Sequence, residues 1–292
     1  MVRNGAGAKA SPRARRVAAE LGMDWKLLQG SGRGGRIREC DVRASSGPHP
    51  GPLPKGEGEK SGLIRSVPMS NRRRVIAERM SASCRQVAPV TLTTRCDATG
   101  LVALRQQLKA AGGMVPAYTD IVAKLTALTL VEHPQLAARW NGENLELPPP
   151  DGFHIGIAVD TDEGLLVPVL RDVARRGLAE IAGDAQRLIE LARGGRLSTS
   201  DMQGGVFTIT NLGAYGIDAF TPIINLPEVA ILGLGAIRRE AVVLDDGQIA
   251  AREMLTLSLT FDHRAVDGAP AARFLQALAV AISNPAAVLV NA

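Results

Sequence analysis

The stretch LTLSLTFDHRAVDGAPAARFL, residues 255–275, combines the signals of a strand, a turn and the start of a helix. Apolar side chains alternate with hydroxyl side chains through LTLSLTF, and this period of two predicts a β-strand over 254–261. A helix is predicted after Pro270, because proline is favoured in the first turn of a helix. The segment therefore places His263 at the junction between a strand and a helix.

His263 lies between two charged residues, Asp262 and Arg264, directly after the predicted strand. A histidine side chain titrates near neutral pH, so His263 is a candidate general base. The alternatives are a hydrogen-bonded turn histidine without a chemical role and a metal ligand paired with Asp267. No third ligand follows nearby, and no metal site is predicted. The three cysteines form no C-x-x-C pair: Cys40, Cys84 and Cys96.

The chain after residue 62 alternates helical and strand patterns. Helical periodicity is predicted over 71–83, 98–111, 117–132 and 178–192. Strand patterns are predicted over 153–159, 165–170, 205–210, 229–235 and 241–244. This order predicts an α/β fold, in which a mixed sheet is covered by helices.

The first 43 residues carry all of the excess positive charge. They hold ten Lys or Arg against four Asp or Glu, which gives +6, whereas the remaining 249 residues carry −1. A short helix is predicted between Ser11 and Gly22, and the G-x-G-x-x-G match at 30–35 is interpreted as a glycine loop because no strand precedes it. Such a basic module is expected to dock onto an acidic surface. Trp25 is its one aromatic residue, which disfavours nucleic-acid binding.

Residues 44–62 hold nine Pro or Gly in 19 positions, and this composition predicts a linker. The predicted organisation is a small all-α domain at 8–44, a linker at 45–62 and a larger domain at 63–292. No apolar run free of charge approaches the roughly 20 residues of a membrane-spanning helix. A soluble protein of the cytoplasm, without a membrane partner, is expected.

The motif His263-x-x-x-Asp267-Gly268 resembles the active-site signature of the dihydrolipoyl acyltransferases. These proteins are the core components of 2-oxo acid dehydrogenase complexes and are related in fold to chloramphenicol acetyltransferase. Three further segments resemble the same family: 69–80, 155–173 and 204–235. Residues 10–42 resemble the peripheral subunit-binding domain of these proteins.

The resemblance implies acyl transfer between a dihydrolipoyl thiol and coenzyme A, which is a substrate, without an acyl-enzyme. It implies that His263 is the general base and that Thr210 stabilises the oxyanion. It also implies that Asp267 pairs with Arg73 to brace the His263 loop, with Gly268 as structural support. The alternative is a non-catalytic scaffold or a subunit that docks the dehydrogenase, which the presence of His263, Asp267 and Thr210 argues against.

The resemblance further implies partners. Arg15, Arg16 and Arg36 are expected to contact dihydrolipoamide dehydrogenase or the decarboxylating component, and the catalytic domain is expected to form homotrimers that can assemble into a cage. None of the six lysines follows an aspartate, unlike the lysine of a lipoyl hairpin. No covalently bound lipoate is therefore expected on this chain, and a lipoylated domain of another chain is expected to supply the lipoyl group.

Overall fold

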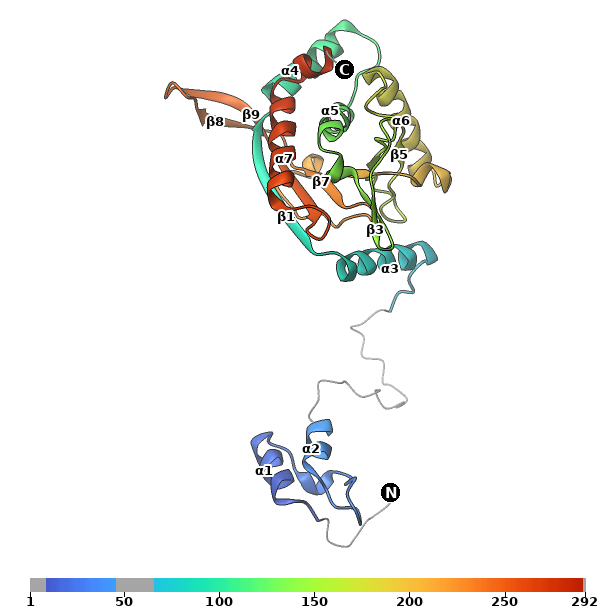
Figure 1. The fold of residues 1–292 in the computed structure, drawn as a ribbon, viewed down its shortest axis with the longest axis vertical. Helices are drawn as coiled ribbons and strands as arrows, with labels where there is room; N and C mark the ends of the chain where they lie inside the picture. The colour runs from blue at the N-terminus through green and yellow to red at the C-terminus, as the bar shows by residue number, and fades with distance from the viewer. Residues whose placement is uncertain (1–8, 46–65, 291–292) are drawn as a thin grey trace. The chain divides into compact units, whose positions relative to one another are not determined.

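The computed structural model describes residues 9–45 and 66–290. The chain divides into two compact units, Met1–Val67 and Pro68–Ala292 (Figure 1). Residues 46–62 of the predicted linker lie outside the described residues. The two units are described separately.

The first unit is helical, as predicted. It contains α1 (Pro12–Glu20), the 3₁₀ turn η1 (Trp25–Leu27) and α2 (Glu39–Ser45). The Ser11 hydroxyl caps α1 by accepting a hydrogen bond of 3.1 Å from the backbone N–H of Ala14. Apolar side chains of α1, α2, the intervening loop and the segment before α1 form one small core: Ala10, Ala14, Val17, Ala18, Ile37 and Val42.

The glycine loop of the first unit is a tight turn. The N–H of Gly32 donates to the carbonyl of Arg36 over 2.9 Å, and Gly35 has a positive φ of 74°. A Cβ on Gly30 would lie 2.5 Å from the backbone of this turn. Gly30 and Gly32 are therefore required by the close approach of two backbone segments, and Gly35 is favoured by its positive φ.

A mixed sheet of seven strands forms the second unit and confirms the predicted fold class. The strands are β1 (Pro89–Asp97), β4 (Ile155–Ile157), β5 (Val169–Leu170), β6 (Phe207–Asn211), β7 (Ala230–Leu234), β8 (Arg238–Val243) and β9 (Ile249–Asp262). Their order is β1-β9-β7-β6-β4-β5, and β8 pairs with β9. Strands β4, β6 and β7 are parallel, and the other pairs are antiparallel. A separate hairpin consists of β2 (Arg139–Asn141) and β3 (Asn144–Glu146).

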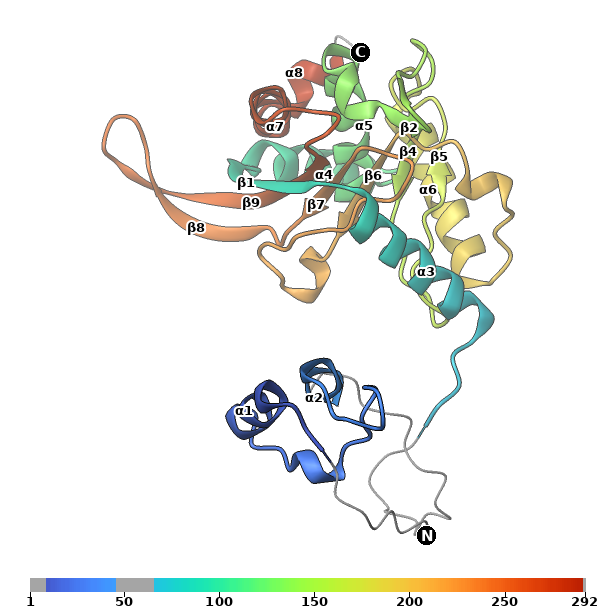
Figure 2. The same ribbon diagram turned by 60° about the horizontal axis from the view of Figure 1, so that its bottom comes forward.

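The helices of this unit are α3 (Asn71–Gln86), α4 (Thr99–Ala111), α5 (Tyr118–Glu132), α6 (Leu178–Arg193), α7 (Gly268–Ser283) and α8 (Pro285–Val290), with 3₁₀ turns η2 (Pro134–Ala137), η3 (Ser200–Met202) and η4 (Gly213–Tyr215). Helix α5 packs against α6 and α7. Figure 2 shows α5 and α7 on the same side of the sheet. No helix in the described part of the chain is long and apolar enough to span a bilayer.

Strand β9 is the central element of the sheet. It pairs with β1 over its last nine residues and with β7 on its other edge. The hydroxyl face that the sequence predicts is covered as well, because Ser258 and Thr260 are each 1% exposed. The hydroxyl of Thr260 lies 2.8 Å from that of Thr91 on β1. The strand also begins earlier than predicted, because its first residues pair with β8 in a hairpin that projects from the unit (Figure 1).

Candidate active site

His263 is the first residue after β9, so it lies at the end of a strand, as the sequence predicts. Its backbone N–H donates a hydrogen bond of 2.9 Å to the carbonyl of Ala88, the residue before β1. The imidazole is tilted by 36° relative to the ring of Phe261, with 5.9 Å between the ring centroids. The side chain remains 47% exposed. The backbone of His263 is thus fixed while its imidazole faces solvent.

Asp267 precedes α7 as its N-cap residue, although its side chain caps no N–H group. Its carboxylate is 84% exposed, and Oδ1 lies 3.9 Å from Nδ1 of His263. Gly268 is the first residue of α7, and a Cβ there would meet no atom within 4 Å. The packing of one chain therefore gives no steric reason for glycine at this position.

The expected pair between Arg73 and Asp267 does not form within the chain. Arg73 is in the first turn of α3, and its guanidinium lies beside Gly164, 3.4 Å from the position of a Cβ on that glycine. Arg73 precedes the end of α3 by 13 residues, which corresponds to about 20 Å of helix. The segment after α3 leads to Ala88, which contacts His263. Arg73 and Asp267 are thus at opposite ends of α3 and do not meet within one chain.

Thr210 lies on β6, far from His263. Thr210 pairs with Gly233 of β7, which pairs with Ser258 of β9. His263 lies five residues beyond Ser258, which corresponds to about 17 Å along the strand and about 10 Å across two strand spacings. A hydroxyl and an imidazole separated in this way cannot act on the same atom within one chain. Thr210 and His263 therefore lie in two separate regions of one chain.

A cavity of about 240 Å³ lies beside β6 and is lined by Ile209 and Asn211, the two neighbours of Thr210, but not by Thr210 itself. Asn211, the residue after Thr210, donates a hydrogen bond of 3.0 Å from Nδ2 to the hydroxyl of Thr119. Across the cavity, the Tyr215 hydroxyl lies 3.4 Å from Oδ2 of Asp160. Burial raises the pKa of Asp120, which also lines the cavity, to about 6. The sequence motifs contain several of these residues but do not reveal that they line one cavity.

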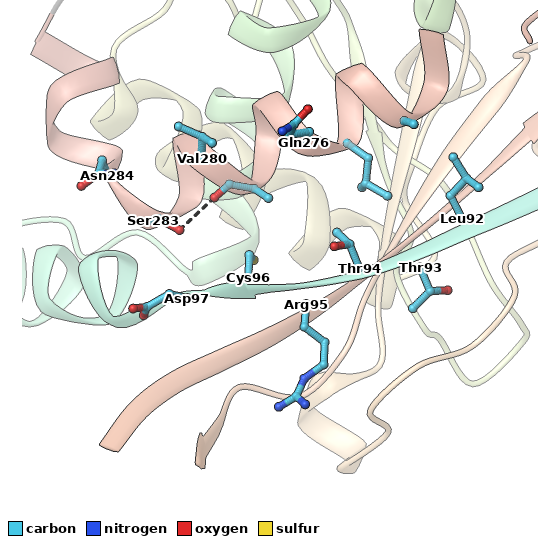
Figure 3. A pocket seen from close by; sticks show the side chains of 13 residues that line it. Leu92, Thr93, Thr94, Arg95, Cys96, Asp97, Gln276, Val280, Ser283 and Asn284 are labelled. Carbon is cyan, nitrogen blue, oxygen red and sulfur yellow. Dashed lines mark hydrogen bonds between the residues drawn. The ribbon is translucent and has the colours of Figure 1, made fainter. Parts of the chain in front are cut away.

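A second cavity, of about 550 Å³, lies between β1 and α7 (Figure 3). The side chains that line it offer little chemistry for catalysis. Arg95 points away from α7 and pairs with Glu240. Burial raises the pKa of the Cys96 thiol to about 12, so this thiol stays protonated at neutral pH and is a poor nucleophile.

The other described histidines have structural roles. His154 accepts a hydrogen bond of 3.1 Å at Nδ1 from the N–H of Asp172, and its burial lowers its pKa. His133 caps α5, and its ring lies edge-on to Phe274. His49 lies outside the described residues. In the part of the chain that the structure describes, no three His, Cys, Asp or Glu side chains are grouped as metal ligands would be.

Glu228, which follows a turn near the start of β7, is a buried carboxyl that the sequence motifs do not reveal. It is 2% exposed. Its Oε2 accepts a hydrogen bond of 2.6 Å from the Thr208 hydroxyl, and its Oε1 accepts one of 3.2 Å from Asn225. Burial raises the pKa of Glu228 to about 7, against the effect of these hydrogen bonds and of two arginines, Arg139 and Arg79. This group titrates near neutral pH inside the protein.

The candidate partner-binding arginines of the first unit are all exposed: Arg15, Arg16 and Arg36. The guanidinium of Arg15 stacks over Trp25 at 4.9 Å from the ring centroid. Within residues 9–45, none of the three forms an ion pair, whereas Arg13 of the same helix pairs with Glu39.

Comparison with known proteins follows the same division of the chain. Residues 62–290 match the family model of the 2-oxoacid dehydrogenases acyltransferase catalytic domain, and residues 8–43 match that of the E3 binding domain.

Two relatives match nearly the whole chain. The acetyltransferase component of the acetoin cleaving system of Bacillus subtilis is 39% identical over 96% of this chain and 70% of its own length. The acyltransferase component of the branched-chain α-keto acid dehydrogenase complex of Pseudomonas putida is 38% identical over 97% of this chain and 68% of its own length.

Among solved structures, the cubic core of the pyruvate dehydrogenase multienzyme complex matches with a TM-score of 0.75 and 38% identity, over 82% of this chain and 99% of that chain.

Proposed function

Because the chain belongs to the 2-oxoacid dehydrogenase acyltransferase family, we propose that it transfers an acyl group between a dihydrolipoyl thiol and coenzyme A, with His263 as the general base. The observation that carries this assignment is the placement of His263. Its backbone is held at the end of β9, and its imidazole is 47% exposed and therefore accessible to a substrate.

The chemistry requires a base because a thiol with a pKa near 8.5 is mostly protonated at neutral pH. His263 removes the proton from the coenzyme A thiol, and the sulfur attacks the carbonyl carbon of the acyl-dihydrolipoyl thioester. The carbonyl oxygen becomes an oxyanion, to which the Thr210 hydroxyl donates a hydrogen bond. The carbon–sulfur bond to the lipoyl group then breaks, and the leaving thiolate takes the proton from the His263 imidazolium. The same steps run in reverse for transfer to dihydrolipoamide.

The site is shared between copies of the chain in this proposal. The separation of Thr210 from His263 along the sheet supports it, as does the likeness to a relative that forms a cubic core. We assign the His263 half of the site to one subunit of a homotrimer and the Thr210 half to the next. The pair of Asp267 with Arg73 likewise forms between subunits in this proposal.

Mixing two inactive variants tests both the residues and the sharing. His263→Ala should lower kcat about 10² to 10⁴ fold, and Thr210→Val about 10² to 10³ fold, with acetyl-, succinyl- and isobutyryl-CoA as donors and free dihydrolipoamide as acceptor. Subunits of the two variants that are denatured and refolded together should regain activity, because some interfaces then combine an intact His263 with an intact Thr210.

The control for this experiment is each variant refolded alone, which should stay inactive. Full activity of His263→Ala would refute the general base. Failure of the mixed trimers to regain activity would refute the shared site. A wild-type chain without turnover of any donor would favour a scaffold function.

The first unit binds dihydrolipoamide dehydrogenase in this proposal, as the match to the E3 binding domain indicates. Its three exposed arginines without internal ion pairs supply the charge: Arg15, Arg16 and Arg36. The lipoyl group is supplied by a lipoylated domain outside these 292 residues, since none of their six lysines follows an aspartate.

A further inference from the structure

Asp262, the residue before His263, is a fully buried carboxylate with an exposed fraction of 0%. Its Oδ1 accepts hydrogen bonds from the N–H of Ala88 over 3.2 Å and from the N–H of Arg264 over 3.1 Å. Its Oδ2 accepts one of 3.0 Å from Nε1 of Trp140 and one of 2.6 Å from the guanidinium of Arg264. Each oxygen therefore has several donors, and the carboxylate joins three separate segments of the chain.

These interactions keep Asp262 charged inside the protein. Burial alone would raise the pKa of Asp262, but the hydrogen bonds from Arg264, Ala88 and Trp140 outweigh burial and hold the pKa below its ordinary value. The same contact raises the pKa of Arg264. Asp262 is buried whereas the Arg264 side chain is 46% exposed, and the cost of desolvating the carboxylate offsets much of the Coulomb attraction in this pair. The ion pair instead fixes the relative orientation of the groups that it joins.

Trp140 extends this arrangement to the β2–β3 hairpin, 122 residues earlier in the chain. The indole donates to Asp262, and the Arg264 guanidinium lies over the indole ring at 4.9 Å from its centroid. Asp262, Trp140 and Arg264 therefore form a closed triangle, which we call the Asp262 cluster. It holds both neighbours of His263 and, through Ala88, the backbone N–H of His263 itself.

We infer that the Asp262 cluster positions His263, and that Trp140 and Arg264 are positioning residues for acyl transfer. The inference rests on the proposed role of His263 as general base. A loop after a strand would otherwise let the imidazole move relative to the coenzyme A thiol. An error of about 1 Å in such a placement costs about 100-fold in rate. The cluster confines the backbone on both sides of His263 and leaves the imidazole free to reach across the subunit boundary.

The inference predicts that variants of the cluster have a lower kcat but nearly the same KM. Arg264→Met removes the guanidinium but keeps a long side chain over Trp140, and kcat should fall about 10- to 100-fold with KM for the acyl-CoA within about twofold. Trp140→Phe removes only the N–H donor and should lower kcat about 3- to 10-fold. Arg264→Lys, which keeps the charge but loses the planar fork, should recover part of the loss.

Arg187→Met is a matched control, because Arg187 and Asp184 also form an ion pair of 2.6 Å but lie on α6, outside the site. Its kcat should equal that of the wild type. Light scattering shows which variants assemble as the wild type does, and only these are compared. If Arg264→Met does not assemble, the smaller change Trp140→Phe decides the test.

Two results would overturn the inference. One is an unchanged kcat in the assembled cluster variants while His263→Ala is inactive, and the other is a loss that appears only in KM. Full activity of His263→Ala would instead refute the proposed function, so the two failures are distinguishable.

Discussion

Replacing Glu228 with glutamine should stabilise the protein increasingly as the pH rises. Glu228 is 2% exposed, and its burial raises its pKa to about 7 from a usual value of 4.5. A change of that size in a carboxyl pKa corresponds to about 3 kcal/mol. The protonated acid is the form that fits the site at low pH, with Thr208 and Asn225 as hydrogen-bond partners. Glutamine imitates that neutral form at every pH.

The sign follows from proton binding. Between about pH 4.5 and pH 7, the folded protein holds a proton on Glu228 that the unfolded chain releases, so this group lowers the free energy of unfolding as the pH rises. Above pH 7 the folded protein carries a buried carboxylate, and the full cost is present. The glutamine variant lacks this titration. Its stability relative to the wild type should therefore grow by about 2 to 3 kcal/mol between pH 5 and pH 8.

Urea unfolding followed by Trp140 fluorescence measures this difference in the unit that contains Glu228. Glu143→Gln, in the exposed turn between β2 and β3, is the matched control and should show no pH-dependent difference from the wild type. A difference between Glu228→Gln and wild type that stays constant from pH 5 to pH 8 would refute the reasoning. So would a variant that loses stability at pH 8, because Glu228 would then be a stabilising carboxylate paired with Arg139 or Arg79.

Two further predictions concern partners. Arg15→Ala and Arg36→Ala should each weaken binding to dihydrolipoamide dehydrogenase about tenfold, the effect of losing one charge-assisted hydrogen bond. Arg13→Ala is the control and should change the affinity little, because Arg13 pairs with Glu39 in the chain itself. Calorimetry at low and high salt measures the affinity, and binding that does not depend on salt would contradict the prediction. The 292-residue chain should show no lipoate on any of its six lysines by mass spectrometry. It should support 2-oxo acid oxidation with its partner enzymes only when a separate lipoylated domain is added, and complete turnover without that domain would contradict the prediction.

The sequence predicts those helices and strands in which the spacing of apolar residues matches the face that is buried. Helix α6 has an apolar stripe that faces the core, and the predicted range 178–192 differs from the observed helix by one residue. Strand β9 alternates as predicted, but its hydroxyl face is buried against other protein atoms, as with Thr260 beside Thr91. Local alternation identifies a strand, whereas the neighbours that cover its second face depend on contacts with distant segments.

Strand β1 was not predicted, although it is the longest partner of β9. Its sequence, PVTLTTRCD over 89–97, contains few large apolar residues and ends in charged ones. It lies at the edge of the sheet and pairs only with β9. An edge strand needs little apolar surface, so its signal is weak in the sequence alone. Its contribution to the site is Ala88, which fixes both Asp262 and His263.

The motifs identify His263 and Thr210 as individual residues but carry no information on the distance between them. That distance follows from strand register, which pairs Thr210 through Gly233 with Ser258 and so places His263 far along the sheet. Trp140 has no motif at all. Its connection with Asp262 spans 122 residues and becomes visible only when the β2–β3 hairpin is placed beside the end of β9.

The proposed division of the site between subunits predicts how the protein tolerates substitutions. In that proposal each half is attached to a strand end within a rigid sheet, so the distance between the imidazole of one subunit and the hydroxyl of the next depends on the subunit interface and on the Asp262 cluster. A substitution that shifts either one alters the reacting geometry without unfolding the chain. Because the effect of misplacement on rate is steep, variants at these positions should lose kcat well before they lose stability, whereas Glu228→Gln should change stability and leave kcat unaltered.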